Sequence, residues 1–239
     1  MTIQTPENMS TVIDQPELHY ILRLMQKEDI PQVTTVDRLA FPNDEPPTSF
    51  EKRLQNRAVC YIVACKNTPE PYDTTNNLDE KPVSEDKTGR GHFTGIILPD
   101  PRQLFQNQNP SRKEQFIYGF AGFWLVIDEA HLLDIGVRPD YQHMGIGESL
   151  LISIISLSLR SNARLVTLEV RVSNKEAQSL YRKYGFVEVG RRYGYYPDNH
   201  EDAFIMNTDR LNTPGYRVLF EKLKQSYIER WGENRKFIL

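Results

Sequence analysis

A glycine-bearing hexapeptide, Gln142-His143-Met144-Gly145-Ile146-Gly147, constrains the fold more than any other feature of this sequence. It follows an apolar segment over residues 132–137 that predicts a strand, and it opens a predicted helix over residues 145–160. Glycine has no Cβ, so a ligand can approach the backbone closely. The first N–H groups of a helix also lack partners within the helix. This junction, here called the glycine turn, therefore predicts a pyrophosphate cradle, although an ordinary turn can have the same spacing.

The rest of the regular chain predicts a mixed central sheet flanked by helices. In residues 165–172, Leu168 and Val170 point to one face and Glu169 to the other. Strands first follow one another and then alternate with helices, so the predicted class is α/β, or α+β, with one domain over residues 18–211. The predicted strands cover residues 20–24, 61–65, 116–127, 131–137, 165–172, 186–196 and 203–208, and the predicted helices cover residues 30–40, 49–54, 145–160, 175–184 and 216–227.

Three segments lie outside this regular pattern. Residues 1–17 are polar and contain two prolines, which predicts a flexible leader. Residues 67–112 hold six of the 15 prolines, and a flexible surface insertion is favoured there over a substrate lid. Residues 212–239 predict a C-terminal helical tail, with Val218 and Leu219 among its apolar residues.

The overall chemistry of the chain argues against several classes of protein. Its net charge is -3 at pH 7, from 29 basic and 32 acidic residues, which disfavours general nucleic-acid binding. The longest apolar stretch, residues 150–159, is interrupted by serines and is too short to cross a bilayer. No signal peptide is expected. Cys60 and Cys65 would point to opposite faces of a strand, so a reduced, cytoplasmic protein is predicted.

Two sequence blocks carry a resemblance to a known family. The first, Val137-x-Pro139-x-Tyr141-Gln142-x-x-Gly145-Ile146-Gly147-x-x-Leu150-Leu151, resembles the acetyl-CoA-binding signature of the GNAT superfamily of N-acetyltransferases. The second runs from Leu168-Glu169-Val170-Arg171-Val172-Ser173-Asn174 through Tyr181 to Tyr184-Gly185-Phe186. It resembles the RimI branch, whose members acetylate the N-terminal alanine of a small-subunit ribosomal protein. The resemblance is dense over residues 116–207, thin over residues 18–66, and absent elsewhere.

The resemblance implies a GNAT fold and a role for each matching residue. By position, Glu169 is the expected general base and Tyr181 the expected general acid. The chain departs from the family pattern at His143, where an arginine or lysine is usual, at Gly136, where alanine is usual, and at Asn43, where an aromatic often follows Phe-Pro. The expected acetyl-CoA contacts are Ile135, Gly136, Val137, His143, Met144, Gly145, Ile146, Gly147, Glu148 and Asn174, and the expected substrate contacts are Phe41, Tyr195 and Tyr196.

Elementary chemistry agrees with these roles and also offers plainer alternatives. An α-amine has a pKa of about 7.7–8.0 and must lose a proton to react, which a carboxylate can accept. Glu169 could instead only pair with Arg171 on the same face of its strand. A phenol can protonate the leaving thiolate, but Tyr181 could equally be a packing residue. Among the remaining candidates, Asn174 fits a helix cap, and His131 is more typical of a structural histidine.

These observations together predict an acetyl-CoA-dependent N-acetyltransferase. The favoured acceptor is the N-terminal α-amine of a protein, alanine first, most naturally a small-subunit ribosomal protein, with direct transfer in a ternary complex. The sequence carries no motif for a metal or an acyl-enzyme nucleophile, and it leaves the oligomeric state open. Two alternatives remain: an enzyme of the same fold that uses a small-molecule amine or a lysine, and a non-catalytic acyl-CoA-binding interaction protein.

Overall fold

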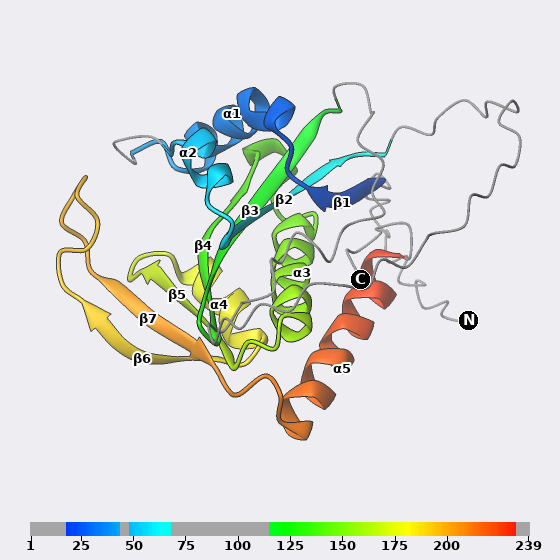
Figure 1. Cartoon of the computed structure of the whole chain (residues 1–239), viewed down its shortest axis with the longest axis vertical. Coiled ribbons are helices and arrows are strands. Elements are labelled where there is room, and N and C mark those ends of the chain that lie inside the picture. The colour runs from blue at the N-terminus through cyan, green and yellow to red at the C-terminus, as the bar shows by residue number, and fades with distance from the viewer. Residues whose placement is uncertain (1–17, 44–47, 68–114, 233–239) are drawn as a thin grey trace, which may run out of the picture.

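The computed structural model describes residues 18–43, 48–67 and 115–232 (Figure 1). The predicted leader over residues 1–17 and nearly all of the predicted insertion over residues 67–112 lie outside these ranges. In chain order the elements are β1 (Tyr20–Leu24), α1 (Ile30–Ala40), α2 (Phe50–Gln55), β2 (Val59–Lys66), β3 (Ile117–Val126), β4 (Glu129–Val137), α3 (Ile146–Arg160), β5 (Leu165–Arg171), α4 (Lys175–Lys183), β6 (Phe186–Arg192), β7 (Ala203–Thr208) and α5 (Pro214–Trp231).

The described strands form one seven-stranded sheet in the order β1-β2-β3-β4-β5-β7-β6. Neighbouring strands are antiparallel, except for β4 and β5, which are parallel. The sheet is therefore mixed and flanked by helices, and the predicted fold class is confirmed. The predicted strand over residues 186–196 is wrong at its end. β6 stops at Arg192, and the chain then turns through Gly194, whose φ of 59° leaves the strand region.

Helices cover both faces of this sheet. On the face of α1 and α2, Val33 and Phe50 pack with alternate residues of β2 such as Tyr61 and Val63. On the opposite face, the other residues of β2 pack with α3, α4 and α5. Cys60 and Cys65 belong to these two separate core clusters, and both side chains are buried and outside any disulfide in the described part of the chain. The prediction that they point to opposite faces is confirmed.

The C-terminal helix α5 is packed into the same core as α3. Its buried residues are Tyr216, Phe220 and Tyr227, which are between 1% and 4% exposed. Val218 is 71% exposed and Leu219 is 40% exposed, so these two apolar residues lie away from the contact face. The division of the chain at residue 212 stays a prediction, while the aromatic face of α5 shows how this helix contacts the rest of the domain.

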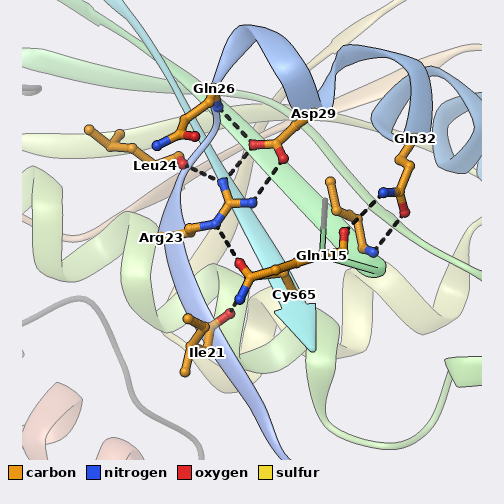
Figure 2. Close-up of polar contacts among 9 residues, drawn as sticks. Ile21, Arg23, Leu24, Gln26, Asp29, Gln32, Cys65 and Gln115 are labelled. Carbon is orange, nitrogen blue, oxygen red and sulfur yellow. Dashed lines mark hydrogen bonds and ion pairs between the residues drawn. The ribbon is translucent and has the colours of Figure 1, made fainter. Parts of the chain in front are cut away.

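A polar cluster ties the first strand to the first helix (Figure 2). Arg23 on β1 donates two hydrogen bonds to the carboxylate of Asp29, at 2.6 and 2.8 Å, and a third to the side chain of Gln115 at 3.2 Å. The side chain of Gln32 on α1 also donates to the carbonyl of Gln115 and accepts from the N–H of Ile117. These bonds satisfy backbone groups at the start of β3, and they fix α1, which leads into the loop that carries Phe41.

Candidate active site

The site begins where the two parallel strands separate. β4 and β5 pair only from Glu129 with Leu165 to Leu132 with Leu168. On its other side, β4 pairs Leu132 with Phe123 and Asp134 with Gly122, so Leu133 is an extra residue that forms a β-bulge. A bulge bends a strand and increases its twist. β4 therefore turns away from β5 at Leu133, and a cleft opens between the carboxyl-terminal halves of the two strands.

Two cavities occupy this cleft and the space beside the glycine turn. The first, about 470 Å³ in volume, is here called the carboxylate pocket and includes Asp134 from β4 and Glu169 from β5. The second, about 440 Å³, is here called the glycine-turn pocket and includes Gly145 and Gly147. The two cavities adjoin, because they share the lining residues Ala40, Phe41, Ile135, Asn174, Ala177 and Tyr181.

The backbone of the glycine turn has the geometry of an anion cradle. Gly145 precedes α3 with a φ of 78°, a left-handed conformation that glycine adopts without strain. Gly147 is the second residue of α3, and a Cβ built on it would meet only a methyl group of Val137, at 3.8 Å. Protein packing therefore does not require glycine at position 147. Its open side faces the glycine-turn pocket, where the first N–H groups of α3 are available to a phosphate.

The other expected acetyl-CoA contacts divide into two groups. Gly136 and Ile146 do not line the glycine-turn pocket. A Cβ at Gly136 would lie 2.6 Å from the ring of Phe120, and the side chain of Ile146 is 1% exposed in the core. Met144 is not part of the pocket lining either. Those that line the pocket are Ile135, Val137, His143, Gly145, Gly147, Glu148 and Asn174.

Most charged groups near the glycine turn are engaged with one another. The Nδ1 atom of His143 lies 3.0 Å from a carboxylate oxygen of Glu176, and both side chains are largely exposed. Glu148 accepts hydrogen bonds from Lys183 at 2.5 Å and from the hydroxyl of Tyr184 at 2.6 Å. The side chain of Asn174 caps α4 by accepting from the N–H of Ala177 at 3.0 Å, as its capping role predicts.

Glu169 is the one carboxylate on β5, and its side chain is buried between two nitrogen-bearing side chains. His131 on β4 lies 2.6 Å from its Oε2 atom, and Arg192 on β6 lies 2.9 Å from its Oε1 atom. Burial raises the pKa of Glu169, but the hydrogen bond from His131 and the charges of His131 and Arg192 outweigh burial and hold it below its usual value. Arg171 instead bonds to Asp198 at 3.0 Å and Glu201 at 3.4 Å.

His131 is therefore part of this cluster, although the sequence favoured a structural histidine over a catalytic base. His131 and Glu169 are 38 residues apart in the sequence, so no local pattern predicts their contact. The parallel register of β4 and β5 places His131 opposite Thr167, two residues before Glu169. A polar residue at the start of an otherwise apolar strand was the one available signal.

Tyr181 lies where the two pockets adjoin. It belongs to the core cluster and packs against Phe186 with 5.6 Å between ring centroids, so Tyr181 does contribute to core packing. It also lines both pockets. Burial, aided by the charge of Asp134, raises the pKa of Tyr181 above its ordinary value. The phenol is consequently neutral and can donate a proton or a hydrogen bond over the whole physiological pH range.

The three expected substrate contacts differ in position. Phe41 lines both pockets, and Tyr196 lines the carboxylate pocket beneath the guanidinium of Arg171, 3.8 Å from the ring centroid. Tyr195 lines neither pocket, and its ring centroid lies 5.4 Å from the guanidinium of Arg192.

The carboxylate pocket has a net negative lining that sequence analysis missed. Asp134 accepts hydrogen bonds from Arg53 at 2.6 Å and from the hydroxyl of Tyr61 at 3.0 Å. Asp134 interrupts an apolar strand, which is the only sequence signal for it. The acidic residues of the lining are Asp37, Asp134, Glu169, Asp198 and Glu201, and the basic ones are Arg53 and Arg171. Such a pocket favours an acceptor with positive charge.

Two further properties concern the described residues only. Among them, no group of three or more His, Cys, Asp or Glu side chains is arranged to hold a metal ion. None of their helices combines the length and apolar character needed to cross a membrane.

This fold, with its split parallel pair and adjoining glycine turn, is similar to that of known acetyltransferases. The family model described as "Acetyltransferase (GNAT) family" matches residues 75–186. An N-alpha-acetyltransferase from Sulfurisphaera tokodaii is 30% identical over 190 residues, which cover 78% of this chain and 91% of that protein. The chain therefore belongs to the GNAT family of N-acetyltransferases.

Bacterial relatives match a shorter part of the chain more closely. The [ribosomal protein bS18]-alanine N-acetyltransferase of Escherichia coli is 45% identical over 89 residues, or 36% of this chain and 60% of that protein. The chain thus spans about three fifths of the length of the bacterial relatives it matches. The crystal structure of the Escherichia coli enzyme superposes with a TM-score of 0.52 at 24% identity, covering 78% of this chain and 91% of that one, which supports the fold.

Proposed function

We propose that this protein transfers the acetyl group of acetyl-CoA to the N-terminal α-amine of a protein, with an alanine-first ribosomal protein as the favoured acceptor. The observation that carries the proposal is the contact between two pockets of different chemistry. The glycine-turn pocket offers backbone N–H groups suited to phosphates, and the carboxylate pocket offers a net negative lining suited to an amine. Tyr181 lies at their boundary, where an acyl group and an amine would meet.

In this proposal, Glu169 accepts the proton of the attacking amine. Its lowered pKa keeps it ionised at neutral pH, so it attracts the amine and can accept hydrogen bonds from it. A carboxylate of low pKa is a weak base toward a free ammonium group. The amine nitrogen, however, becomes far more acidic as it bonds to the thioester carbon, and proton transfer to Glu169 becomes favourable at that point. His131 and Arg192 hold the carboxylate in place.

Tyr181 is the proposed proton donor to the sulfur that leaves. Acetyl-CoA supplies a thioester, so the departing group is a thiolate that must be protonated. The phenol of Tyr181 is kept neutral by burial and lines both pockets. These properties suit a donor, and the same tyrosine packed in the core has little freedom to leave that position.

A second candidate function is acetylation of a small cationic amine, and the same net negative lining favours it. A panel of acceptors separates the two. It contains an alanine-first peptide, the same peptide with a blocked N-terminus and an internal lysine, and a polyamine. We expect mass spectrometry to find acetylation at the α-amine of the first peptide with the highest kcat/KM. Preference for the polyamine or the blocked peptide would replace the proposed acceptor, and no turnover with any acceptor would favour the non-catalytic alternative.

The ribosomal acceptor is tested separately. Intact-mass measurement of the ribosomal proteins of the source organism, with and without the gene, is expected to show one small-subunit protein that loses 42 Da, roughly the mass of an acetyl group, when the enzyme is absent. Unchanged masses for all ribosomal proteins would direct the search to other protein N-termini.

A further inference from the structure

The C-terminal helix supplies part of the wall of the glycine-turn pocket. α5 lies beside α3 (Figure 1), and its residue Tyr227 is 1% exposed. The hydroxyl of Tyr227 donates to the carbonyl of Gly145 at 3.1 Å and lies 2.8 Å from the hydroxyl of Tyr20. Tyr20 in turn donates to Ser149 of α3 at 2.8 Å. These contacts fix the position of α5 relative to the first turn of α3.

The last turn of α5 brings two residues into that pocket. Arg230 and Trp231 follow Tyr227 by three and four residues, so they lie near it on the same side of the helix. Both line the glycine-turn pocket together with His143 and Gly147. The guanidinium of Arg230 lies 5.0 Å from the centroid of the Trp231 ring, and its side chain is exposed.

Arg230 is the cation of this lining that the described residues leave available. His143 is paired with Glu176, and Glu148 is occupied by Lys183 and Tyr184. Within the described part of the chain, Arg230 has no carboxylate partner; its contact there is with the ring of Trp231. An arginine offers several donors in a planar fork that matches phosphate, and an indole offers a face for a nucleobase.

We propose that Arg230 and Trp231 form the binding site for the nucleotide end of CoA, with Arg230 on a phosphate and Trp231 against the adenine. The inference rests on the proposed use of acetyl-CoA. It adds that the cation for the phosphates comes from the C-terminal helix, since position 143 holds a histidine whose ring nitrogen lies 3.0 Å from the carboxylate of Glu176. The binding site for the donor is therefore built from both the central glycine turn and the end of α5.

The test measures dissociation constants by calorimetry for three ligands: CoA, dephospho-CoA and pantetheine. Arg230→Gln is expected to weaken CoA binding about tenfold, as for loss of one charge-assisted hydrogen bond at an exposed site. Pantetheine, which has no phosphate, is expected to bind wild type and variant equally. If Arg230→Gln weakens the binding of dephospho-CoA as much as that of CoA, Arg230 contacts the pyrophosphate. If it leaves the binding of dephospho-CoA unchanged, Arg230 contacts the 3′-phosphate. Both results support the inference.

Arg217→Gln on the first turn of the same helix is the matched control. Arg217 is exposed and lies outside both pockets, so its loss changes the net charge equally without removing the contact. Equal CoA affinity for Arg230→Gln and wild type, or equal weakening by Arg217→Gln, would overturn the inference. Failure of the wild-type protein to bind CoA at all would instead overturn the proposed function.

The proposed contact between Trp231 and adenine is tested separately, by tryptophan fluorescence. The chain contains two tryptophans, so Trp124→Phe leaves Trp231 as the only one. Trp124 lies on β3 and lines neither pocket. Stacking on adenine is expected to quench the emission of Trp231 when CoA or adenosine diphosphate is added, and pantetheine is expected to cause no change. Unchanged emission on saturation with CoA would remove Trp231 from the site.

Discussion

Replacement of Gly147 by alanine should change stability and cofactor affinity in opposite directions. A Cβ at this position would meet only Val137, at an ordinary contact distance of 3.8 Å. Glycine in a helix costs about 0.5–1 kcal/mol relative to alanine. For a domain of this size that is worth about 1–4 °C in Tm. We therefore expect the ligand-free Gly147→Ala protein to unfold at a slightly higher temperature than wild type.

The same methyl group would occupy the space in which a phosphate approaches the start of α3. Loss of one hydrogen bond to a charged group costs about 1.5–3 kcal/mol. This corresponds to about 10- to 150-fold weaker binding of acetyl-CoA, because each factor of ten is about 1.4 kcal/mol. Calorimetric titration with CoA and thermal unfolding without ligand measure the two effects separately.

Gly215 provides the matched control for this experiment. Like Gly147, it is the second residue of a helix, here α5, and a Cβ built on it would meet nothing within 4 Å. Gly215 lines neither pocket. Gly215→Ala should therefore raise Tm in the same way and leave CoA affinity unchanged. If Gly147→Ala binds CoA as tightly as Gly215→Ala does, the close approach of phosphate to the glycine turn is refuted.

Further predictions concern the catalytic groups and the anchor of α5. Glu169→Gln and Tyr181→Phe should each lower single-turnover rates by roughly 10²–10⁴-fold. Only the first should recover partly as pH rises, because hydroxide can then take the proton that the amine loses as it bonds to the thioester carbon; wild-type rates in both would make these residues structural. Because His131 lowers the pKa of Glu169, His131→Asn should raise the pKa of that carboxyl group in a carbon-13 NMR titration, and an unmoved pKa would contradict that coupling. Ionised Glu169 should stabilise the fold above the ordinary carboxyl pKa of about 4.3, and this contribution should be lost as pH falls through the lower pKa of the folded protein. The free energy of unfolding of Glu169→Gln should therefore fall less steeply with decreasing pH than that of wild type. Tyr227→Phe should lower the free energy of unfolding by about 1 kcal/mol in urea titration, and no change would mean that its bond to Gly145 contributes nothing.

Local patterns in the sequence were enough to predict most of the fold. The alternation around Glu169 and the glycines before α3 reflect short-range rules of strands and helix starts, and both elements are present as expected. The end of β6 was mispredicted because aromatic residues after Arg192 have strand propensity, whereas Gly194 turns the chain. The contact face of α5 was not predicted: its tyrosines and phenylalanine pack in the core, whereas Val218 is exposed.

The candidate site was predictable where a short motif marked it. The glycine turn was selected from its place before a predicted helix, and Glu169 and Tyr181 mainly from the family resemblance; their roles stay predictions. The partners of Glu169 were not found, because His131 and Arg192 reach it only through the register of β4 and the packing of β6. The place of Arg230 in the pocket lining was missed for the same reason: the end of α5, with Tyr227 82 residues after Gly145, returns to the glycine turn through tertiary contacts that no local pattern contains.

The bond between Tyr227 and Gly145 also sets the order in which the pocket can be completed during synthesis. These two residues are 82 positions apart, and the contact of Tyr227 with Tyr20 spans 207 positions. At ribosomal rates of about 5–20 residues per second, roughly 4–16 s separate the synthesis of the glycine turn from that of its last wall. Throughout that interval the glycine-turn pocket lacks the wall that α5 supplies. If α5 binds CoA as we propose, the growing chain acquires its full affinity for CoA only when this helix has been made.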